Sequence, residues 1–520
     1  MQSKPFGRIR GFLWPIHGHE HRKLLPIFTL FFLITFVYDV LRCMKVTLVV
    51  TAHGSSAEII PFLKVWGVLP GAILLTYIYT KLSNRLNREH VFYAMIAIFL
   101  GFFTLFMLVL HPHREALELT SLASFLQAKL PAWLKGLSGL MMALRHWHLS
   151  LFYVLSELWG AVMLSMLFWG FANEITTVDE AKRFYAIFSI GVNSSGIFSG
   201  QFAQLLTLEN YNPHLPFGTV AWEQSLILQL SVLLAMGLAI IILFRYLNRS
   251  LLKQDEKRAV ESNTHKPESS AKLSLKECFG YLTKSRYMVY ITILVVAYNI
   301  AYNLFDVLWT GQIHARYPDA SEFNAYYNQL TSITGVFATL FALVLSGNVI
   351  RRYGWTVTAM ITPIIMLVMS IGFFGCLLGN HAHTLSDFLG ALLGAPLYTF
   401  AWVFGAAQMC LGRAAKYTVF DESKEIAFIP LSREDQRKGK AVVDGIASRF
   451  GKSGGSIIIQ VLLVMCGELA LTIPYIALIF CVVVMVWMFA IRRLGKLASK
   501  TIDQEIQTQT LAEPLVLSQT

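Results

Sequence analysis

Residues 58–80 read EIIPFLKVWGVLPGAILLTYIYT, an apolar run that carries one lysine, Lys64, inside it. A bilayer core about 30 Å thick needs roughly 20 consecutive, predominantly apolar residues in helical form. Helices and closed barrels alone satisfy every backbone hydrogen bond in lipid, and this run is too long for a barrel strand. The stretch therefore predicts a membrane-spanning helix, in which the charge of Lys64 needs an explanation.

The same pattern recurs along the chain. Of its 520 residues 55% are hydrophobic and 14% are charged, whereas soluble domains carry about 25% charged residues. We therefore predict an all-α membrane protein of about twelve transmembrane helices. The apolar runs cover residues 24–41, 59–80, 91–110, 149–173, 184–208, 222–244, 287–309, 328–350, 356–378, 387–411, 441–466 and 471–491.

The longest polar interruption separates the sixth run from the seventh and contains QDEKRAVESNTHKPESSAK, a charged, Ser-rich linker. Six helices, a linker and six more helices are typical of a transporter built from two parallel six-helix halves. The predicted organisation is a cytoplasmic arm (1–23), an N-terminal half (24–247), a cytoplasmic linker (248–286), a C-terminal half (287–495) and a cytoplasmic tail (496–520).

The net charge of +12 reflects membrane topology rather than nucleic-acid binding. Basic pairs such as Arg351 with Arg352 and Arg492 with Arg493 directly follow or separate apolar runs, in segments that the positive-inside rule places in the cytoplasm. We expect both termini in the cytoplasm, the lipid bilayer as surroundings and no nucleic acid as partner.

No cofactor or metal site is indicated. The six cysteines are scattered and form no CxxC pair, which argues against a disulfide framework or a zinc site. His17, His19 and His21 could ligate a metal, but a solvated basic arm is the favoured interpretation.

The segment Gly451-Lys452-Ser453-Gly-Gly resembles the end of a phosphate-binding P-loop. The required spacing is G-x-x-x-x-G-K-[ST], and Gly445 stands one residue too far back. No βαβ pattern surrounds the segment, so its glycines favour close helix packing or local unwinding instead.

Charged residues inside the apolar runs are the candidate site, because each costs several kcal/mol unless it meets a partner or a wet cavity. Arginine and lysine in such places suit a polyphosphate anion, which they bind through charge-assisted hydrogen bonds. Acids beside them can neutralise the cations while the cavity is empty, or carry protons. The candidate cations are Arg42, Lys45, Lys64, Lys440, Arg449 and Lys452, and the candidate acids are Asp39, Glu157 and Asp306.

Two simpler interpretations stay open for these charges. Arg42, Lys45 and Lys440 could snorkel to a membrane interface. Glu157 and Asp306 are too short to snorkel, and could instead form structural ion pairs.

Four stretches carry a resemblance to a known family: LVVTAHGSSAEIIPFLK (48–64), LFYVLSELWGAVMLSMLFWGFANEITTVDEAKRFYAIFSIG (151–191), KEIAFIPL (424–431) and KGKAVVDGIASRFGKSGGS (438–456). They resemble the ATP:ADP antiporter family of nucleotide transporters from plastids and intracellular bacteria, over nearly the whole chain. The resemblance implies a twelve-helix, major-facilitator-like transporter that moves nucleotides by alternating access. It also implies functional charges at Lys64, Glu157, Asp306 and Lys438 or Lys440, and a polar substrate-region residue at Asn193.

The chain departs from the family pattern at the end of its first run. Exchangers of the family typically read YTILRDTKD there, and this chain reads YDVLRCMKV (38–46), so that two acids are lost and Asp39 appears. The leading hypothesis is therefore proton-coupled import of nucleoside triphosphates into an intracellular, chlamydia-like bacterium across its inner membrane, with Asp39, Glu157 and Asp306 as coupling or gating acids. ATP/ADP exchange is the alternative.

Two other classes fit less well. A membrane-embedded enzyme would need a clustered acid/base or metal set, and a non-transporting nucleotide receptor would bind without flux. The preferred base is left open among many possible stacking partners, which include Tyr38, Trp66, Trp169, Phe184 and Tyr302.

Overall fold

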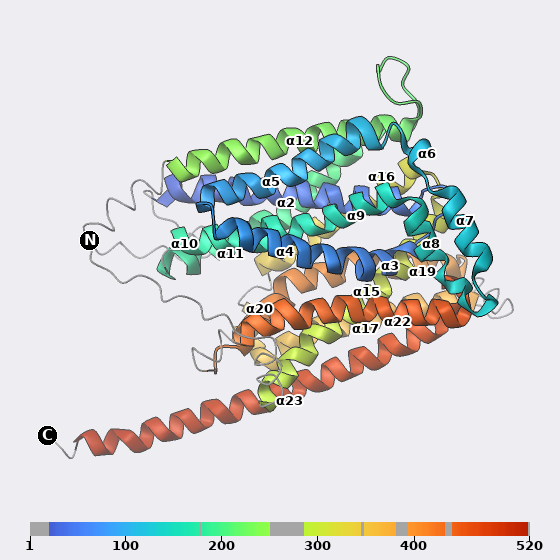
Figure 1. Ribbon diagram of the computed structural model, residues 1–520. Coiled ribbons are helices and arrows are strands. Elements are labelled where there is room, and N and C mark those ends of the chain that lie inside the picture. Colours follow the sequence, from blue (N-terminus) through green and yellow to red (C-terminus); the bar gives the residue numbers. More distant parts are fainter. Residues whose placement is uncertain are drawn as a thin grey trace. The chain divides into compact units, whose positions relative to one another are not determined.

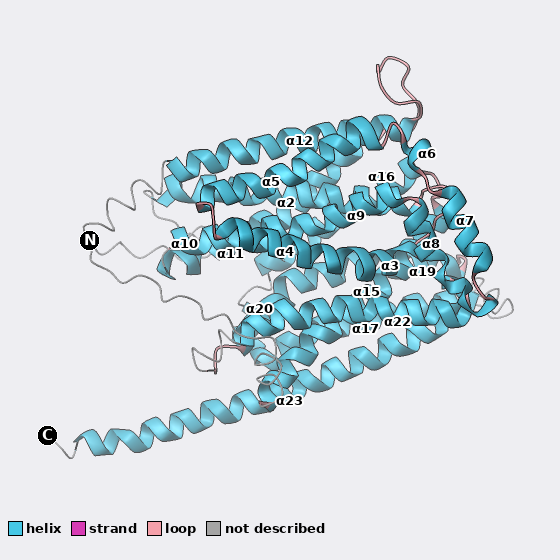
Figure 2. Cartoon of the chain, viewed as in Figure 1, coloured by secondary structure: helices cyan, strands magenta, loops and turns pink. Residues whose placement is uncertain are grey.

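A computed structural model describes residues 20–176, 178–249, 285–344, 348–380, 394–431 and 439–517. Within these ranges the chain forms helices joined by loops and turns, with no strand (Figure 2). The prediction of an all-α protein is confirmed. His17, His19, most of the predicted linker and Lys438 lie outside the described residues.

The described residues group by their contacts into two compact units. Unit 1 comprises residues 20–130, 138–249 and 312–339, and unit 2 comprises residues 131–137, 285–311 and 340–517. Each unit is treated separately below.

Most of unit 1 consists of six long helical stretches followed by α16, with short helices between the third and fourth. These elements are α2 (His21–Val50), α3 (Ile59–Phe62) continuing through η2 (Leu63–Val68) and α4 (Leu69–Ser83), α5 (Arg88–Leu105) with η3 (Phe106–Leu110), α6 (Arg114–Leu117), α7 (Thr120–Lys129), α8 (Ser138–Arg145), α9 (Trp147–Trp159) with η5 (Gly160–Phe168) and α10 (Trp169–Ile175), α11 (Val178–Leu205), α12 (Ala221–Leu247) and α16 (Ala320–Val344).

Unit 2 contains the remaining helices. They are η4 (Ala132–Leu137), α15 (Arg286–Arg316), α17 (Asn348–Asn380), α19 (Leu397–Ala415) with η7 (Lys416–Phe420) and α20 (Asp421–Ala427), η8 (Ala441–Ala447) with α22 (Ser448–Cys466), and α23 (Leu469–Leu517). The last few residues of α15 and of α16 belong to the other unit.

Nine of the described helical stretches are long and apolar enough to cross a membrane. The three that fall below this threshold, α11, α16 and the α19–α20 stretch, carry polar residues along their length. Where the structure describes them, the predicted runs lie on helices for most of their length, so the count of twelve is approximately right. Their limits differ: α2 continues to Val50, and α16 begins at Ala320, eight residues before the predicted run.

The core of unit 1 forms around α2. Buried residues occur on all sides of this helix, which is the pattern of a helix enclosed by others. Phe31 of α2 stacks on Phe168 with ring centroids 3.9 Å apart. At the edge of the unit, α5 and α12 run side by side (Figure 1), and Phe92 stacks on Phe244 at 3.7 Å.

In unit 2 glycines bring α15 and α22 together. A Cβ at Gly451 would lie 2.7 Å from Asn299 Cβ, and one at Gly455 would lie 3.0 Å from the Asn303 side chain. A Cβ at Gly454 would meet nothing within 4 Å. The P-loop-like segment is therefore a helix-packing segment. Gly451 and Gly455 make the close contacts with α15, and Gly454 does not.

Five helical stretches contain a π-helical segment, in which the backbone hydrogen bonds run from i to i+5. The segments are η2, η3, η5, η7 and η8. Such wide turns are uncommon and often mark functional sites. Among the described charges, Lys64 lies in η2, Glu157 three residues before η5, and Lys440 directly before η8.

Candidate functional site

Three cations of unit 1 lie near one another, Arg42 and Lys45 on α2 and Lys64 on η2. The side chain of Lys45 is only 3% exposed and forms an ion pair with Glu157 of α9, while its ammonium lies 4.9 Å from the centre of the Tyr153 ring. Arg42 and Lys64 both repel Lys45 electrostatically. Because α2 extends to Val50, Arg42 and Lys45 lie inside the helix rather than at its end.

The burial of Lys45 decides between the two interpretations of this residue. A snorkelling lysine keeps its ammonium in water, whereas here the side chain is enclosed and neutralised by Glu157. Lys45 and Glu157 therefore form a buried cation–acid pair, and for Lys45 snorkelling is wrong. Lys64 is half-buried in η2.

Asp39 forms an ion pair with Arg42, as Glu157 does with Lys45. Its carboxylate lies 3.5 Å from the Arg42 guanidinium one turn along α2 and accepts a hydrogen bond of 3.2 Å from the Ser195 hydroxyl. Arg42 donates a further hydrogen bond, of 3.1 Å, to the Thr331 hydroxyl of α16. Asp39, the acid by which this chain departs from the family pattern, is thus paired with a cation.

Asn193 of α11 is buried, and its side-chain amide nitrogen has no hydrogen-bond partner among the described residues. A buried donor without a partner costs about 1–3 kcal/mol, so such groups call for a ligand or a functional reason. This observation agrees with the polar substrate-region role that the resemblance implies for Asn193.

Unit 2 holds a second pair, formed by Asp306 of α15 and Arg413 of α19. The Arg413 Nη2 atom lies 3.6 Å from Asp306 Oδ1, and Arg413 Nε donates a 2.5 Å hydrogen bond to the Tyr302 hydroxyl. The Tyr302 hydroxyl in turn lies 3.3 Å from Asp306 Oδ1 and donates to it. The side chain of Arg413 is buried.

Arg413 is a buried charged residue that the sequence analysis does not single out. The predicted apolar run ends at residue 411, whereas the helix continues through η7 to Ala427, which places Arg413 in its interior. A signal is present in the sequence: the apolar pattern resumes after Gly412-Arg413 with Ala414 and Ala415.

The predicted cations of the eleventh run, Lys440, Arg449 and Lys452, form no ion pair with Asp306 among the described residues. Lys440 forms a 2.5 Å ion pair with Glu425, and the neighbouring Lys424 bonds Asp444 at 2.7 Å. Arg449 and Lys452 are exposed and form no ion pair with any described residue. Lys440 is thus part of a surface charge network, and the phosphate-binding role of all three stays a prediction.

The possible base-stacking residues differ in how far their rings are already packed against other side chains. Phe184 is fully buried beside Phe188, and Trp169 packs its edge against Phe31 and Phe168. Tyr38 closes over Gly160, where a Cβ would lie 2.6 Å from its ring. Trp66 is 65% exposed, and Tyr302 belongs to the Arg413 pair.

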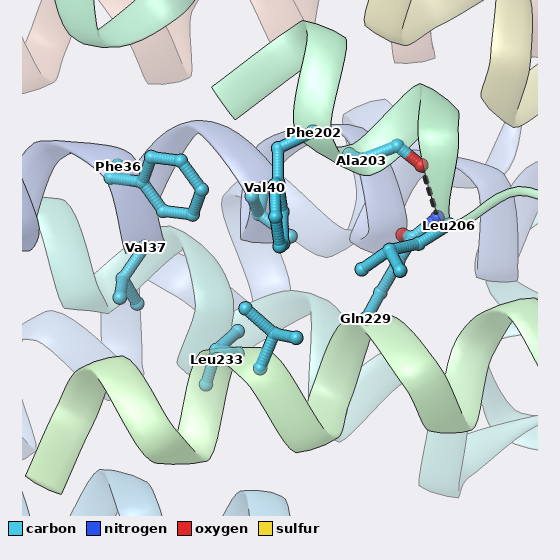
Figure 3. A pocket seen from close by; sticks show the side chains of 9 residues that line it. Phe36, Val37, Val40, Phe202, Ala203, Leu206, Gln229 and Leu233 are labelled. Atoms are coloured by element: carbon cyan, nitrogen blue, oxygen red, sulfur yellow. Dashed lines mark hydrogen bonds between the residues drawn. The ribbon is translucent and has the colours of Figure 1, made fainter. Parts of the chain in front are cut away.

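A small recess in unit 1 is unsuited to a polyphosphate. It lies between α2, α11 and α12, and its walls are aliphatic and aromatic except for Gln229, which hydrogen-bonds the Ala203 carbonyl at 3.2 Å (Figure 3). None of its lining residues is charged. The described residues also contain no group of three metal-ligating side chains.

These observations define the class of the protein. It is a polytopic helical membrane protein whose buried charges are arranged as cation–acid pairs on helices long enough to span a bilayer. That arrangement fits a transporter of anions.

Comparison with known proteins identifies the family. Residues 1–497 match the family described as TLC ATP/ADP transporter. ADP,ATP carrier protein 1 of Chlamydia muridarum is 42% identical over 514 residues, which cover 98% of this chain and 95% of the relative. ADP,ATP carrier protein 1, chloroplastic, of Arabidopsis thaliana is 39% identical over 491 residues, which cover 94% of this chain and 76% of the relative. The chain belongs to the TLC ATP/ADP transporter family and is a nucleotide transporter rather than an enzyme.

Solved structures show the fold. A point mutant of the nucleoside transporter NupG aligns with a TM-score of 0.53 at 15% identity, over 90% of this chain and 99% of that one. A bacterial homologue of the iron transporter ferroportin in its inward-facing state gives 0.54 at 12% identity, over 91% and 99%. The D-xylose-proton symporter gives 0.50 at 13%, over 92% and 98%. The major-facilitator-like prediction is confirmed.

Proposed function

We propose that the protein exchanges ATP for ADP across a bacterial membrane by alternating access, with buried cations binding the phosphates. The observation that carries this proposal is the cluster of Arg42, Lys45 and Lys64 beside Asp39 and Glu157. Cations at this depth in a membrane protein are costly unless a counter-charge meets them. A nucleotide phosphate is such a counter-charge, and it would compete with Asp39 and Glu157 for these side chains.

The paired acids favour exchange over uniport. When no nucleotide is bound, Glu157 and Asp39 neutralise Lys45 and Arg42, so the empty site stays closed around its own ion pairs. A bound polyphosphate competes with the acids for the same cations through charge-assisted hydrogen bonds. Only the loaded carrier then changes conformation readily, which couples the movement of one nucleotide to the return of another. The relatives named as ADP,ATP carriers support the same function.

Proton-coupled import of nucleoside triphosphates is the second candidate. It is favoured by Asp39, an acid at membrane depth that exchangers of the family do not typically carry there. Against it stands the contact of Asp39 with Arg42 and Ser195, which gives this acid a structural role as the counter-charge of Arg42.

Flux measurements in liposomes distinguish the two. Purified protein would be reconstituted with internal ADP, with internal ATP or empty, and uptake of labelled external ATP would be followed with and without a pH gradient and a protonophore. Exchange predicts uptake that requires internal nucleotide and ignores the protonophore. Uptake into empty liposomes that follows the pH gradient would establish the second candidate, and the absence of nucleotide-dependent flux in every condition would contradict both.

Lys64→Gln tests the binding cluster in the same assay. Loss of one charge-assisted phosphate contact should raise the nucleotide concentration for half-maximal uptake by about 10-fold or more, while the protein still inserts. Lys81→Gln is the matched control, because Lys81 lies on the same helical stretch, is exposed and contacts the Tyr77 ring. Unchanged uptake in Lys64→Gln would remove Lys64 from the phosphate site.

A further inference from the structure

We propose that Arg413 is an anion-binding residue of the transport pathway, held by Asp306 and Tyr302 in the empty protein and transferred to a nucleotide phosphate on binding. This inference rests on the proposed transport function and adds to it an anion-binding residue on unit 2. Asp306 becomes the partner that the substrate displaces, and Tyr302 the group that orients the guanidinium.

The position of the pair makes a surface role untenable. Asp306 lies about three turns before the end of α15, and Arg413 lies near the middle of the helical stretch from Leu397 to Ala427. Their side chains are 14% and 7% exposed. Ionised groups at such depth are costly and in general face a cavity, a partner or a pathway.

The contact between Arg413 Nη2 and Asp306 Oδ1 is longer than the strongest arginine–carboxylate contacts. The strongest arginine–carboxylate contacts are bidentate, with two parallel N–H···O bonds of about 2.7–2.9 Å. Here the ion pair joins Arg413 Nη2 to Asp306 Oδ1 over 3.6 Å. The tighter contact of Arg413 is the 2.5 Å hydrogen bond to the neutral Tyr302 hydroxyl. A phosphate that reaches the guanidinium can form shorter charge-assisted bonds than this contact between Nη2 and Oδ1.

Tyr302 fixes the guanidinium without neutralising it. Its hydroxyl accepts from Arg413 Nε and donates to Asp306, and the guanidinium carbon lies 5.5 Å from the centre of its ring. Tyr298 stacks on Tyr302 with ring centroids 5.9 Å apart, and on Phe420 at 4.8 Å. This aromatic support holds Arg413 in place when Asp306 no longer does, which is what a binding residue requires.

A second, independent observation is the π-helical segment next to Arg413. Arg413 precedes η7 by three residues, the same offset that separates Glu157 from η5, and Lys64 lies within η2. Wide turns beside charged residues thus recur at the cation cluster of unit 1 and at the Arg413 pair of unit 2. Since π-helical turns concentrate at functional sites, the recurrence groups Arg413 with the site residues rather than with the packing.

The competing interpretation is a purely structural ion pair. Buried pairs of this kind contribute little net stability, and apolar replacements of both partners are often neutral or stabilising. A structural pair and a substrate-binding pair differ in one measurable respect. In the binding pair, loss of Asp306 frees Arg413 for the nucleotide, so the two single substitutions change nucleotide affinity in opposite directions.

The experiment measures nucleotide binding and exchange by full-length protein carrying Arg413→Gln, Arg413→Lys or Asp306→Asn. Binding is read as the shift of the thermal unfolding midpoint in detergent with increasing ADP or ATP, and exchange as uptake into ADP-loaded liposomes. Arg413→Gln should weaken apparent affinity by about 10-fold or more, and Arg413→Lys by less. Asp306→Asn should tighten binding at least a few-fold and slow exchange, because the empty site loses its counter-charge.

Arg114→Gln is the matched control. It also breaks a pair between an arginine and a buried carboxylate, that of Arg114 on the short helix α6 with Glu223 in the first turn of α12. It should lower the midpoint without nucleotide but leave apparent affinity as in the unsubstituted protein.

The outcomes separate the two claims. In one outcome the unsubstituted protein binds and exchanges nucleotides, Asp306→Asn does not bind them more tightly, and Arg413→Gln keeps its affinity. Arg413 is then structural, and the transport function stands. If Arg413→Gln does not insert, the comparison of Asp306→Asn with the unsubstituted protein still decides, since tighter binding supports the inference and unchanged or weaker binding overturns it. Absence of binding and exchange in the unsubstituted protein would instead contradict the proposed function.

Discussion

At the scale of single residues, His111 makes stability depend on pH in a defined direction. It lies between η3 and α6, outside the spanning helices, packs on Phe106 and faces Arg114, Glu223 and His148. Burial, with help from Arg114 and against the effect of Glu223, lowers the pKa of His111 from 6.5 to about 4.

The direction of the pH dependence follows because the pKa of His111 is lower in the folded protein than in the unfolded chain. As pH falls from about 6.5 to 4, the unfolded chain takes up a proton at His111 that the folded protein does not, so stability is lost, by about 2 kcal/mol at pH 5. Unfolding midpoints of the unsubstituted protein and of His111→Gln should be compared between pH 5 and 7.5. The variant should lose less stability on acidification, and equal slopes would show that His111 does not titrate in this way.

For the site charges, the sequence predicts the positions but not the pairing. Lys45, Glu157, Asp39 and Asp306 stand out because a charge inside an apolar run is costly wherever the chain folds. Which cation meets which acid depends on helices far apart in the sequence, as the contact between Lys45 and Glu157 shows. Arg413 escapes sequence analysis for a different reason, because it lies two residues after the end of the predicted apolar run 387–411.

At the scale of elements, glycine and amide side chains hold α16 in unit 1. A Cβ at Gly200 of α11 would lie 2.5 Å from the Asn328 carbonyl oxygen, so the two backbones touch there. Beside this contact Asn324 is fully buried, donates to Thr47 at 3.1 Å and accepts from Gln229 at 3.0 Å. In lipid, close approach at small residues and inter-helix hydrogen bonds replace the hydrophobic effect as the source of packing energy.

Gly200→Ala should therefore destabilise the protein. The added methyl group meets backbone, which cannot move aside as a flexible side chain can, and overpacking of this kind typically costs about 1–3 kcal/mol. Gly101→Ala is the control, because a Cβ at Gly101 meets nothing within 4 Å. Thermal unfolding in detergent should show a clear loss for Gly200→Ala and little change for Gly101→Ala, and equal midpoints would contradict the close contact.

Element limits are predictable only in part. Runs such as 222–244 cover nearly the whole of α12, because apolar length is a property of the local sequence. The run that ends at residue 41 misses the last turns of α2, since Arg42 and Lys45 interrupt the apolar pattern while their burial depends on α9 and α16. The predicted run at 328 likewise misses the first turns of α16, because polar residues there are buried by contacts with other residues. Asn324 and Asn328 bond to each other, and Asn324 bonds to α2.

At the scale of the whole molecule, the sequence predicts an all-α, major-facilitator-like transporter, and both the described helices and the solved structures of similar fold agree. Composition suffices for this level, because the bilayer fixes the length and the polarity of each spanning element. The two six-helix halves and the cytoplasmic location of both termini stay predictions.

The orientation follows from the basic loops and can be measured. Alkaline phosphatase or a fluorescent protein fused after residue 520, or inserted in the loop at Arg85, should report a cytoplasmic location, and fusions in the segment 207–220 should report the opposite side. A periplasmic signal at the C-terminal fusion would overturn the predicted topology.

The π-helical segments also change how residues along these helices should be assigned to faces. Each wide turn adds a residue to the helix without completing an extra turn, so the angular phase of side chains slips across the segment. In the stretch from Trp147 to Ile175 the faces before Gly160 and after Phe168 are therefore out of register. A single helical wheel drawn through this stretch would therefore place Glu157 on the same face as residues after Phe168 with which it shares no face.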